Sequence, residues 1–386
     1  MNARALRLAP ATLPPGALKV REEVRDFLRE ELDAGTFTPR CDAWLSGFSA
    51  EFSRRMGERG WLGMTWPRQY GGGERSGLER FVVVEEVLAA GAPVAAHWIA
   101  DRQSGPALLR YGTEEQRCQL LPAIARGECF IAIGMSEPDT GSDLASVRTR
   151  AVPDGDAWRV TGTKVWTSQA HRSHYMIALC RTSPADEDDR HAGLSQFIVD
   201  LHAPGVQINP IRLLDGEHHF NEVVLQDVQV PASMVLGSTG AGWEQVIAEL
   251  AFERSGPERF LSTFPLLREL VHVATADPDV RFLSALGRLT AQLITLRQLS
   301  LRIAAALDRG EAPDVAAALV KDLGTRFENE VIDAVRLAVP VEPSLASAVP
   351  LARTFAEAVL HSPGFTLRGG TTEILRGIVA RGLGLR

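Results

Sequence analysis

The apolar residues of this chain change their spacing twice, and these two changes constrain the fold more than any other feature. In residues 18–127 apolar side chains recur every three or four positions, as at Val20 and Val24, which is typical of helices. In residues 130–236 short runs rich in β-branched and aromatic residues alternate with turn residues, which predicts strands. The helical spacing returns after residue 237 and continues to the end of the chain.

We therefore expect an α+β multi-domain protein. It should consist of a helical N-domain (residues 1–130), a middle domain built as an antiparallel β barrel or sandwich (131–237), and a helical-bundle C-domain (238–386). The turn sequences Asp154–Gly155 and Pro204–Gly205 separate predicted strands. The strands that we predict in the middle domain cover residues 131–134, 158–166, 175–181, 196–201, 205–211 and 220–224.

Charge and composition argue against several classes of protein. The net charge is -7 and basic residues are interspersed with acidic ones, so we expect no nucleic-acid partner. The apolar runs are far shorter than a bilayer span, which predicts no membrane span. Residues 9–16 contain three prolines and no apolar signal-peptide core, so we expect a cytoplasmic protein. The four cysteines are widely spaced and form no CxxC pair, which argues against disulfides and zinc ribbons.

The sequence contains none of the common nucleotide, metal or hydrolase motifs. There is no GxGxxG behind a predicted strand, no GxxxxGK[ST] loop and no GxSxG elbow. His171, His174 and the pair His218–His219 lack the cysteines or spaced carboxylates of a ligand set, so we expect no metal site.

Two segments of the predicted β domain could carry chemistry. One is residues 135–143, MSEPDTGSD, and the other is residues 162–168, GTKVWTS. Each places hydroxyl groups and backbone N–H groups at a strand end, and Trp166 could cover a planar ring. Taken alone, Trp166 also fits a core tryptophan, and Ser136 or Ser168 a turn hydroxyl. Their joint occurrence favours a flavin.

The two segments resemble the flavin-contacting signatures of the acyl-CoA dehydrogenase family, TEPxxGSD and KxWITN, in the same order and spacing. The resemblance extends over most of residues 60–254 and the tail, with Gln169 where the family usually has asparagine. It implies that three domains enclose FAD, with an acyl thioester on one flavin face. The residues that it assigns to FAD are Met135, Ser136, Ser142, Trp166, Thr167, Ser168, Gly370 and Thr371.

The catalytic base is the main departure from the family pattern. The tail reads TLRGGT, so Gly369 stands where the family usually has its glutamate. Isovaleryl-CoA and long-chain acyl-CoA dehydrogenases place their base on the first helix of the C-domain, and resemblance to that branch assigns the base to Glu253. It also gives Arg254 and Ser142 a role in binding the CoA arm of the substrate. Burial would raise the pKa of Glu253, and an ion pair with Arg254 would oppose that change.

Helical spacing places Glu253 at the edge of an apolar stripe. The stripe consists of Trp243, Val246, Ile247 and Leu250. A boundary glutamate in a surface ion pair remains the alternative for this residue. Glu373 is a second candidate for the base, although an acid just after Thr371 also fits a helix start. Gly370 and Thr371 would meet the FAD phosphates at that helix start.

The resemblance implies FAD-dependent α,β-dehydrogenation of an acyl-CoA or acyl-carrier thioester to the trans-2-enoyl thioester, with electrons passed to an electron-transfer flavoprotein. Two alternatives stay open: an acyl-CoA oxidase or flavin monooxygenase of the same superfamily, and a non-catalytic partner subunit. The family's RxxFG and QxxGG segments, which bind a neighbouring subunit's FAD, are missing. The resemblance implies a homodimer or homotetramer, as is usual in the family. The missing segments indicate either that the nucleotide half of FAD is held differently or that the chain forms a hetero-oligomer with a related subunit.

Overall fold

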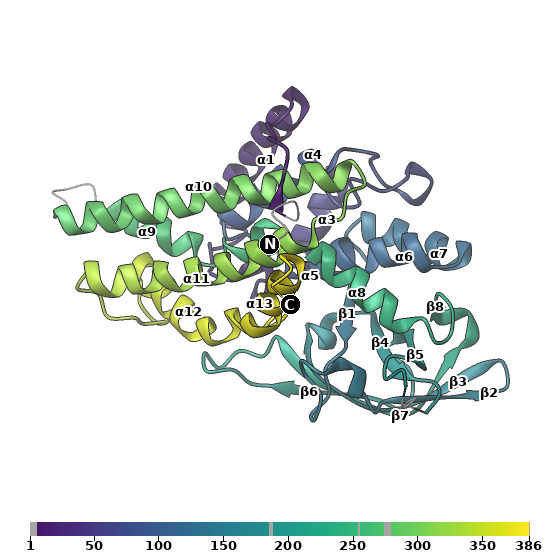
Figure 1. Ribbon diagram of the computed structural model, residues 1–386. Helices are drawn as coiled ribbons and strands as arrows, with labels where there is room; N and C mark the ends of the chain where they lie inside the picture. Colours follow the sequence, from purple (N-terminus) through teal and green to yellow (C-terminus); the bar gives the residue numbers. More distant parts are fainter. Residues whose placement is uncertain (1–5, 185–187, 254, 274–278, 386) are drawn as a thin grey trace. The chain divides into compact units, whose positions relative to one another are not determined.

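The computed structural model describes residues 6–184, 188–253, 255–273 and 279–385, without the side chains of residues 249–253. Backbone contacts divide the chain into two units (Figure 1). The helical unit comprises Met1–Gly47, Arg75–Val94 and Glu253–Arg386, and the sheet unit comprises Phe48–Glu74 and Ala95–Phe252. Two early segments of the chain thus pack with its C-terminal third.

In the helical unit, long helices pack along one another. Contacts join α1 to α4, α4 to α10, α10 to α11, and α11 to both α12 and α13. Helix α4 begins with a capping box, in which Ser76 and Glu79 satisfy each other's backbone N–H groups. The elements of this unit are α1 (Pro15–Asp33), α2 (Ala43–Ser46), α4 (Gly77–Ala89), η7 (Pro257–Arg259), α9 (Phe264–Val273), α10 (Val280–Asp308), α11 (Asp314–Ala338), α12 (Pro350–Phe365) and α13 (Thr372–Gly382).

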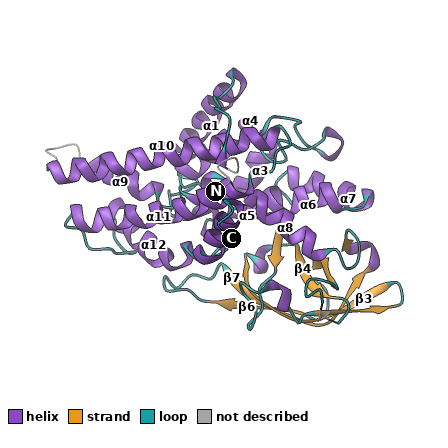
Figure 2. Ribbon diagram, in the orientation of Figure 1, coloured by secondary structure: helices purple, strands orange, loops and turns teal. Residues whose placement is uncertain are grey.

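The sheet unit combines short helices with a β-sheet, drawn in orange in Figure 2. Its helical elements are α3 (Ala50–Glu58), η2 (Arg68–Tyr70), α5 (Ala95–Ile99), η3 (Ala100–Ser104), α6 (Gly105–Tyr111), α7 (Glu114–Ala125), η4 (Leu144–Ser146), η5 (Ala170–Arg172), η6 (Ala232–Met234) and α8 (Gly242–Glu253). Its strands are β1 (Ile131–Gly134), β2 (Arg150–Asp154), β3 (Ala157–Ser168), β4 (Tyr175–Arg181), β5 (Leu194–Asp200), β6 (Val206–Ile211), β7 (Phe220–Pro231) and β8 (Val235–Leu236).

The strands of the described residues form one sheet in the order β6-β7-β3-β2-β4-β5-β8, and β1 pairs with β4. Most pairs are antiparallel, as expected, but β1 runs parallel to β4. The predicted arrangement of a β region between two helical regions is confirmed. Strands 131–134 and 175–181 have the predicted limits, β7 continues seven residues beyond the predicted end at 224, and β2 and β8 were not predicted.

Strand β4 is buried on both faces, which explains its unbroken apolar sequence. Met176, Ala178 and Cys180 belong to a core cluster with residues of β3, β5 and β7. Ile177, which points to the other face, packs in a cluster that contains Leu121 of α7. One face of the sheet is therefore covered by helices of its own unit.

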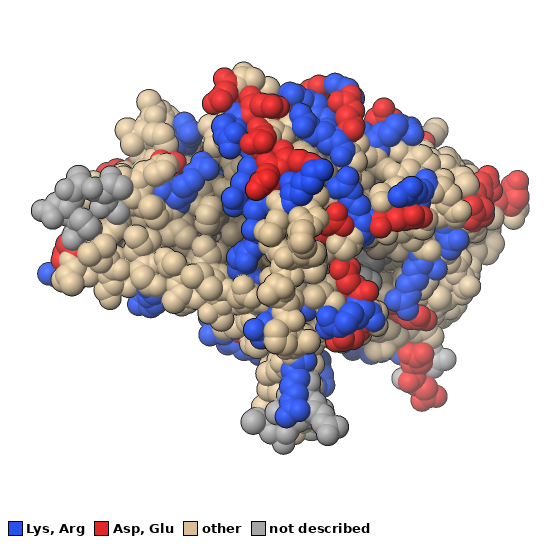
Figure 3. All heavy atoms as spheres, turned by 90° about the horizontal axis from the view of Figure 1, so that it is seen from above, with Lys and Arg blue, Asp and Glu red and all other residues tan. Residues whose placement is uncertain are grey.

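Opposite charges alternate on the face shown in Figure 3. The Nη2 of Arg21 on α1 lies 3.0 Å from a carboxylate oxygen of Glu85 on α4, and Arg297 on α10 donates to the same carboxylate over 2.6 Å. These ion pairs link three helices of the helical unit. Among the helices of the described residues, none is long and apolar enough to cross a membrane.

Gly324 on α11 predicts a stability test. A Cβ at this position would lie 2.1 Å from the carbonyl oxygen of Arg259, whereas a Cβ at Gly287 on α10 would meet nothing within 4 Å. We expect Gly324→Ala to destabilise the helical unit by about 2 kcal/mol or more, because backbone must move. We expect Gly287→Ala to gain up to about 1 kcal/mol from helix propensity. Thermal melts of both variants test this, and equal midpoints would contradict it.

Candidate active site

The structure brings the ends of strands β1 and β3 together. Ser136 follows β1 by two residues, and its carbonyl oxygen accepts a hydrogen bond from the N–H of Val165 in β3 over 2.9 Å. Met135 and Ser136 therefore lie beside the segment Trp166–Thr167–Ser168 that closes β3. The two sequence segments that we singled out meet at one edge of the sheet unit.

A buried ion pair holds this junction. The Lys164 ammonium donates to the Glu137 carboxylate over 2.7 Å and to the carbonyl oxygen of Met135 over 3.2 Å. The same carboxylate accepts the backbone N–H groups of Arg148 (2.7 Å) and Thr149 (2.9 Å). Lys164 is fully buried and Glu137 nearly so. Burial pushes the pKa of Glu137 upward, but the Lys164 charge and these hydrogen bonds leave it below its ordinary value.

Trp166 is displayed by an irregular backbone. The pairing of β3 with β7 shifts register between Lys164 and Thr167, and Trp166 has φ = 59°, in the left-handed region. A bulky residue there is an outlier and costs about 1–3 kcal/mol. Its side chain is 55% exposed and touches Phe220 edge-on, with ring centroids 5.7 Å apart. The strand end thus holds a large aromatic plane at the surface of this unit.

Hydroxyl groups flank this tryptophan. Thr167 is fully buried, and its Oγ1 has no hydrogen-bond partner among the described residues. Ser168 is half-buried, and Ser142 lies exposed in the segment between β1 and η4. A buried hydroxyl without a partner is costly. With no exposed surface, the Thr167 hydroxyl is out of reach of a ligand, whereas Ser168 and Ser142 are accessible.

The tail residues assigned to FAD lie in the helical unit. Gly369 and Gly370 have φ angles of 66° and 96°, and the Thr371 hydroxyl caps α13 by accepting the N–H of Ile374. Hydrogen bonds at this helix start hold the pKa of the exposed Glu373 below its ordinary value. A general base needs a raised pKa, so Glu373 fits a helix-capping position better than a catalytic one.

Helix α8 is fixed to the sheet at its first turn. The N–H of Gly240 donates to Ser195 Oγ over 2.8 Å, and the Gln245 amide donates to the carbonyl oxygen of Leu236 over 2.9 Å. Val246 is buried in an apolar cluster that Met135 and Trp243 also contact. The first half of α8 therefore packs beside the Met135 segment.

The predicted apolar stripe on α8 is wrong at one position. Ile247 is 53% exposed, because the buried face of the helix follows Val246 and Gln245 instead. The backbone of α8 continues to Glu253. The side chains of Leu250 and Glu253, and the whole of Arg254, lie outside the described residues.

Sequence reasoning assigned no role to Lys164 and Glu137, although both stand inside the quoted segments. The sequence carries little signal for this pair, because β3 contains Arg159 and several threonines besides Lys164, so the pattern does not show which polar side chain is buried. Elsewhere in the sheet unit, the rings of His171 and His218 lie 4.3 Å apart, and burial lowers the pKa of His171 to about 4. No group of three metal-binding side chains occurs in the part of the chain that the structure describes.

Comparisons with known proteins agree with this geometry. Family models for the acyl-CoA dehydrogenase N-terminal, middle and C-terminal domains match residues 15–128, 132–228 and 274–384. Acyl-CoA dehydrogenase FadE29 of Mycobacterium tuberculosis is 36% identical over 349 residues, which cover 85% of this chain and 86% of FadE29. The chain belongs to the acyl-CoA dehydrogenase family. The protein is therefore an oxidoreductase, and the cofactor of its family is FAD.

Two solved structures illustrate the similarity of this acyl-CoA dehydrogenase to its relatives. The "Tcur3481-Tcur3483 steroid ACAD" superimposes with a TM-score of 0.85 at 32% identity, covering 96% of this chain and 97% of that one. The ChsE4-ChsE5 complex from Mycobacterium tuberculosis gives a TM-score of 0.80 at 28% identity, covering 98% and 100%.

The residues at the β1 and β3 ends fit the flavin that the family requires. Trp166 offers an exposed aromatic plane and Ser168 a half-buried hydroxyl, whereas the Thr167 hydroxyl has no exposed surface. An isoalloxazine has a planar ring and several hydrogen-bonding heteroatoms, so it complements both the Trp166 ring and the Ser168 hydroxyl. Ser136 adds a hydroxyl group beside them.

The Lys164–Glu137 pair predicts a characteristic pH dependence. In Lys164→Met the buried Glu137 carboxyl loses its counter-charge, so its folded-state pKa rises above the unfolded value. That variant then gains stability as pH falls from neutral, whereas the lowered pKa of Glu137 makes the wild type lose stability. The free energy of unfolding of Lys164→Met should be about 3–5 kcal/mol below that of the wild type near pH 7, and this difference should shrink toward pH 4.

The matched control is Arg159→Met on the same strand, which removes a half-exposed ion pair with Asp154 at 3.4 Å. It should cost less than about 1 kcal/mol at any pH. Urea titrations between pH 4 and 8 measure both differences. A Lys164→Met difference that stays constant with pH would contradict the buried pair.

Replacing Trp166 should weaken FAD binding without lowering the stability of the protein. Trp166→Asn places a residue that tolerates left-handed backbone at φ = 59° and removes little buried surface, so the melting temperature of the apoprotein should not fall. FAD should bind about tenfold more weakly without the ring contact. Trp158→Asn, on the same strand but packed edge-on against Phe197, should instead lower the melting temperature. A Trp166→Asn protein with wild-type FAD affinity would remove the tryptophan from the cofactor site.

Proposed function

We propose that this acyl-CoA dehydrogenase removes a hydrogen from each of the α and β carbons of an acyl thioester, giving the trans-2-enoyl thioester, with Glu253 as the base. The observation that carries the proposal is the strand-end site of the sheet unit, where the exposed Trp166 ring and the half-buried Ser136 and Ser168 fit a flavin. Helix α8 packs against the Met135 segment and leads to Glu253 two turns beyond the buried Val246. Gly369 leaves the family's usual base position without a carboxyl.

Each residue then has a task that its chemistry allows. FAD supplies the two-electron acceptor for the hydrogen that leaves the β carbon. The Glu253 carboxylate takes the α proton, and Arg254 and Ser142 bind the CoA arm by charge and hydrogen bonding. Backbone groups of Met135 and Thr167 and the hydroxyl groups of Ser136 and Ser168 orient the ring system, while Trp166 covers it and excludes water. Gly370 and Thr371 receive the phosphates of the cofactor at the start of α13.

We also propose the partners of the reaction. An electron-transfer flavoprotein would reoxidise the enzyme, as the family resemblance implies. The relatives named Tcur3481-Tcur3483 and ChsE4-ChsE5 are each described as two different proteins, and this chain lacks the RxxFG and QxxGG segments. Both facts support a mixed assembly with a related subunit. The 32% identity with the protein described as a steroid ACAD favours a bulky acyl group.

Anaerobic titration tests the reaction and the base together. The purified protein, co-expressed with a related subunit where it needs one, should be yellow, and a CoA ester from a panel of linear, branched and steroid acyl groups should bleach the flavin absorbance. Glu253→Gln should slow bleaching by about 10²–10⁴-fold, because the general base is lost. Glu244→Gln, at an exposed position in the first turn of α8, is the control and should bleach at the wild-type rate.

Three results would count against the proposal. Bleaching at the wild-type rate by Glu253→Gln would remove that residue from catalysis. Hydrogen peroxide formed in step with product in air, without an added acceptor, would identify an oxidase or monooxygenase instead. A chain that takes up no FAD while its co-purified relative is yellow would be a non-catalytic partner subunit.

A further inference from the structure

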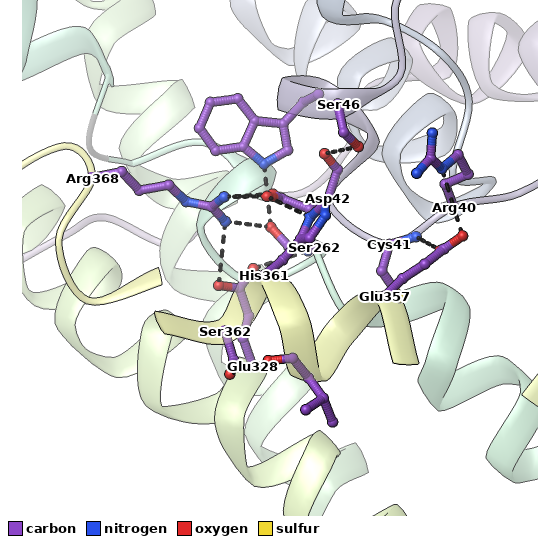
Figure 4. Close-up of polar contacts among 12 residues, drawn as sticks. Arg40, Cys41, Asp42, Ser46, Ser262, Glu328, Glu357, His361, Ser362 and Arg368 are labelled. Atoms are coloured by element: carbon purple, nitrogen blue, oxygen red, sulfur yellow. Dashed lines mark hydrogen bonds and ion pairs between the residues drawn. The ribbon is translucent and has the colours of Figure 1, made fainter. Parts of the chain in front are cut away.

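The helical unit contains a buried cluster of polar side chains that has no role in the proposed reaction. We call it the Arg368 cluster, and Figure 4 shows its side chains converging from five separate segments. These segments are the start of α2, the η7–α9 connection, α11, α12 and the loop before α13. The members of the cluster are Asp42, Ser262, Glu328, His361 and Arg368.

Arg368 is the centre of the Arg368 cluster. Its Nη1 lies 2.5 and 2.6 Å from the two carboxylate oxygens of Asp42, and its Nη2 donates to Ser262 Oγ over 2.8 Å. The guanidinium also lies over the rings of Trp44 (4.6 Å) and Phe365 (4.7 Å). Charge-assisted hydrogen bonds and flat stacking together fix a guanidinium in both position and orientation.

The electrostatics favour a permanently charged Asp42–Arg368 pair. Burial pushes the pKa of Asp42 upward, but Arg368 and His361 outweigh that effect and lower it to about 2. Burial raises the pKa of Glu328, whose carboxylate lies 3.8 Å from Arg368 Nη2. A buried pair of this kind adds little net stability compared with apolar side chains of the same size, but it specifies geometry.

The segment that Arg368 anchors is the loop to α13. Gly369 and Gly370 both have left-handed φ angles, and Thr371 then caps the helix. Two glycines lose much conformational entropy when they are held in one geometry, so the loop needs an anchor on each side. Arg368 fixes the loop at its N-terminal end, and Thr371 fixes it at the start of α13.

A second cation lies under the same loop. A Cβ built on Gly369 would lie 2.9 Å from Nη1 of Arg259, whose side chain is buried and lies 5.3 Å from the Trp44 ring centre. Because Arg368 is paired with Asp42 and Arg259 lies 3.8 Å from the Glu258 carboxylate, the N-terminus of α13 is the main source of positive potential at Gly370 and Thr371. This potential favours an anionic group at the loop.

We propose that Arg368 is a positioning residue for the cofactor: held by Asp42 and Ser262, it fixes the loop 369–371 in the conformation that receives the FAD diphosphate. The inference rests on the proposed function, because it takes FAD as the ligand of this loop. Arg368 directly precedes the loop in the chain, so it acts on the cofactor through the backbone of residues 369–371 and not by direct contact.

The test compares FAD with riboflavin, which lacks the diphosphate and the adenosine of FAD. Dissociation constants of FAD and riboflavin are measured by flavin fluorescence on the apoprotein, in the same assembly for all variants. Arg368→Gln and Asp42→Asn should weaken FAD binding by tenfold or more and leave riboflavin binding within twofold. Arg368→Lys keeps the charge but not the fork of donors, so we expect an intermediate loss of three- to tenfold.

Glu357→Gln is the matched control. Glu357 accepts the N–H of Cys41 over 3.0 Å and lies 3.6 Å from Arg40, so it holds the backbone just before Asp42 rather than the loop 369–371. It should lower the melting temperature yet keep the wild-type ratio of FAD to riboflavin affinity. If Arg368→Gln does not fold, Arg368→Lys and Ser262→Ala carry the test, with FAD losses in the same direction.

The outcomes separate this inference from the proposed function. An Arg368→Gln protein that binds FAD as tightly as a yellow wild type overturns the positioning role, as does an equal loss of FAD and riboflavin. A wild-type protein that binds no FAD in any assembly overturns the proposed function instead.

Discussion

The geometry of the candidate site depends on one buried ammonium group. Lys164 sits inside the sheet unit, where an unpaired charge is not tolerated, and Glu137 is its partner at 2.7 Å. Because Lys164 belongs to β3 and Glu137 follows β1, satisfying the charge also joins the two strand ends. The backbone bond from Val165 to Ser136 and the exposed position of Trp166 follow from that junction.

The fold was predictable where the pattern is local. Strands β1 and β4 are short apolar runs bounded by turn residues, so their limits are visible in the sequence. Strand β2 is mostly exposed, and β8 has two residues, so neither carries a periodic apolar signal. The packing of α4 with helices some 200 residues later was not predictable, because periodicity shows that a helix has a buried face but not what covers it. The three-domain division by residue number stays a prediction beside the two units.

Some features of the candidate site could likewise be predicted from local sequence, and others could not. The residues at the strand ends could be proposed from their motifs, whereas the left-handed backbone of Trp166 could not, because it results from a register shift between β3 and β7. The exposure of Ile247 was mispredicted because a single helix can bury either edge of a broad apolar stripe. The Arg368 cluster was out of reach, since it gathers side chains from position 42 to position 368.

The position of Gly369 limits how this chain could change over evolutionary time. A new side chain there would enter a left-handed backbone and meet the buried Arg259 guanidinium at 2.9 Å. An acid at this position would therefore adopt a strained backbone conformation and would either displace the Arg259 guanidinium or pair with it. The backbone of this loop thus favours a residue without a side chain at position 369 and disfavours a carboxyl there.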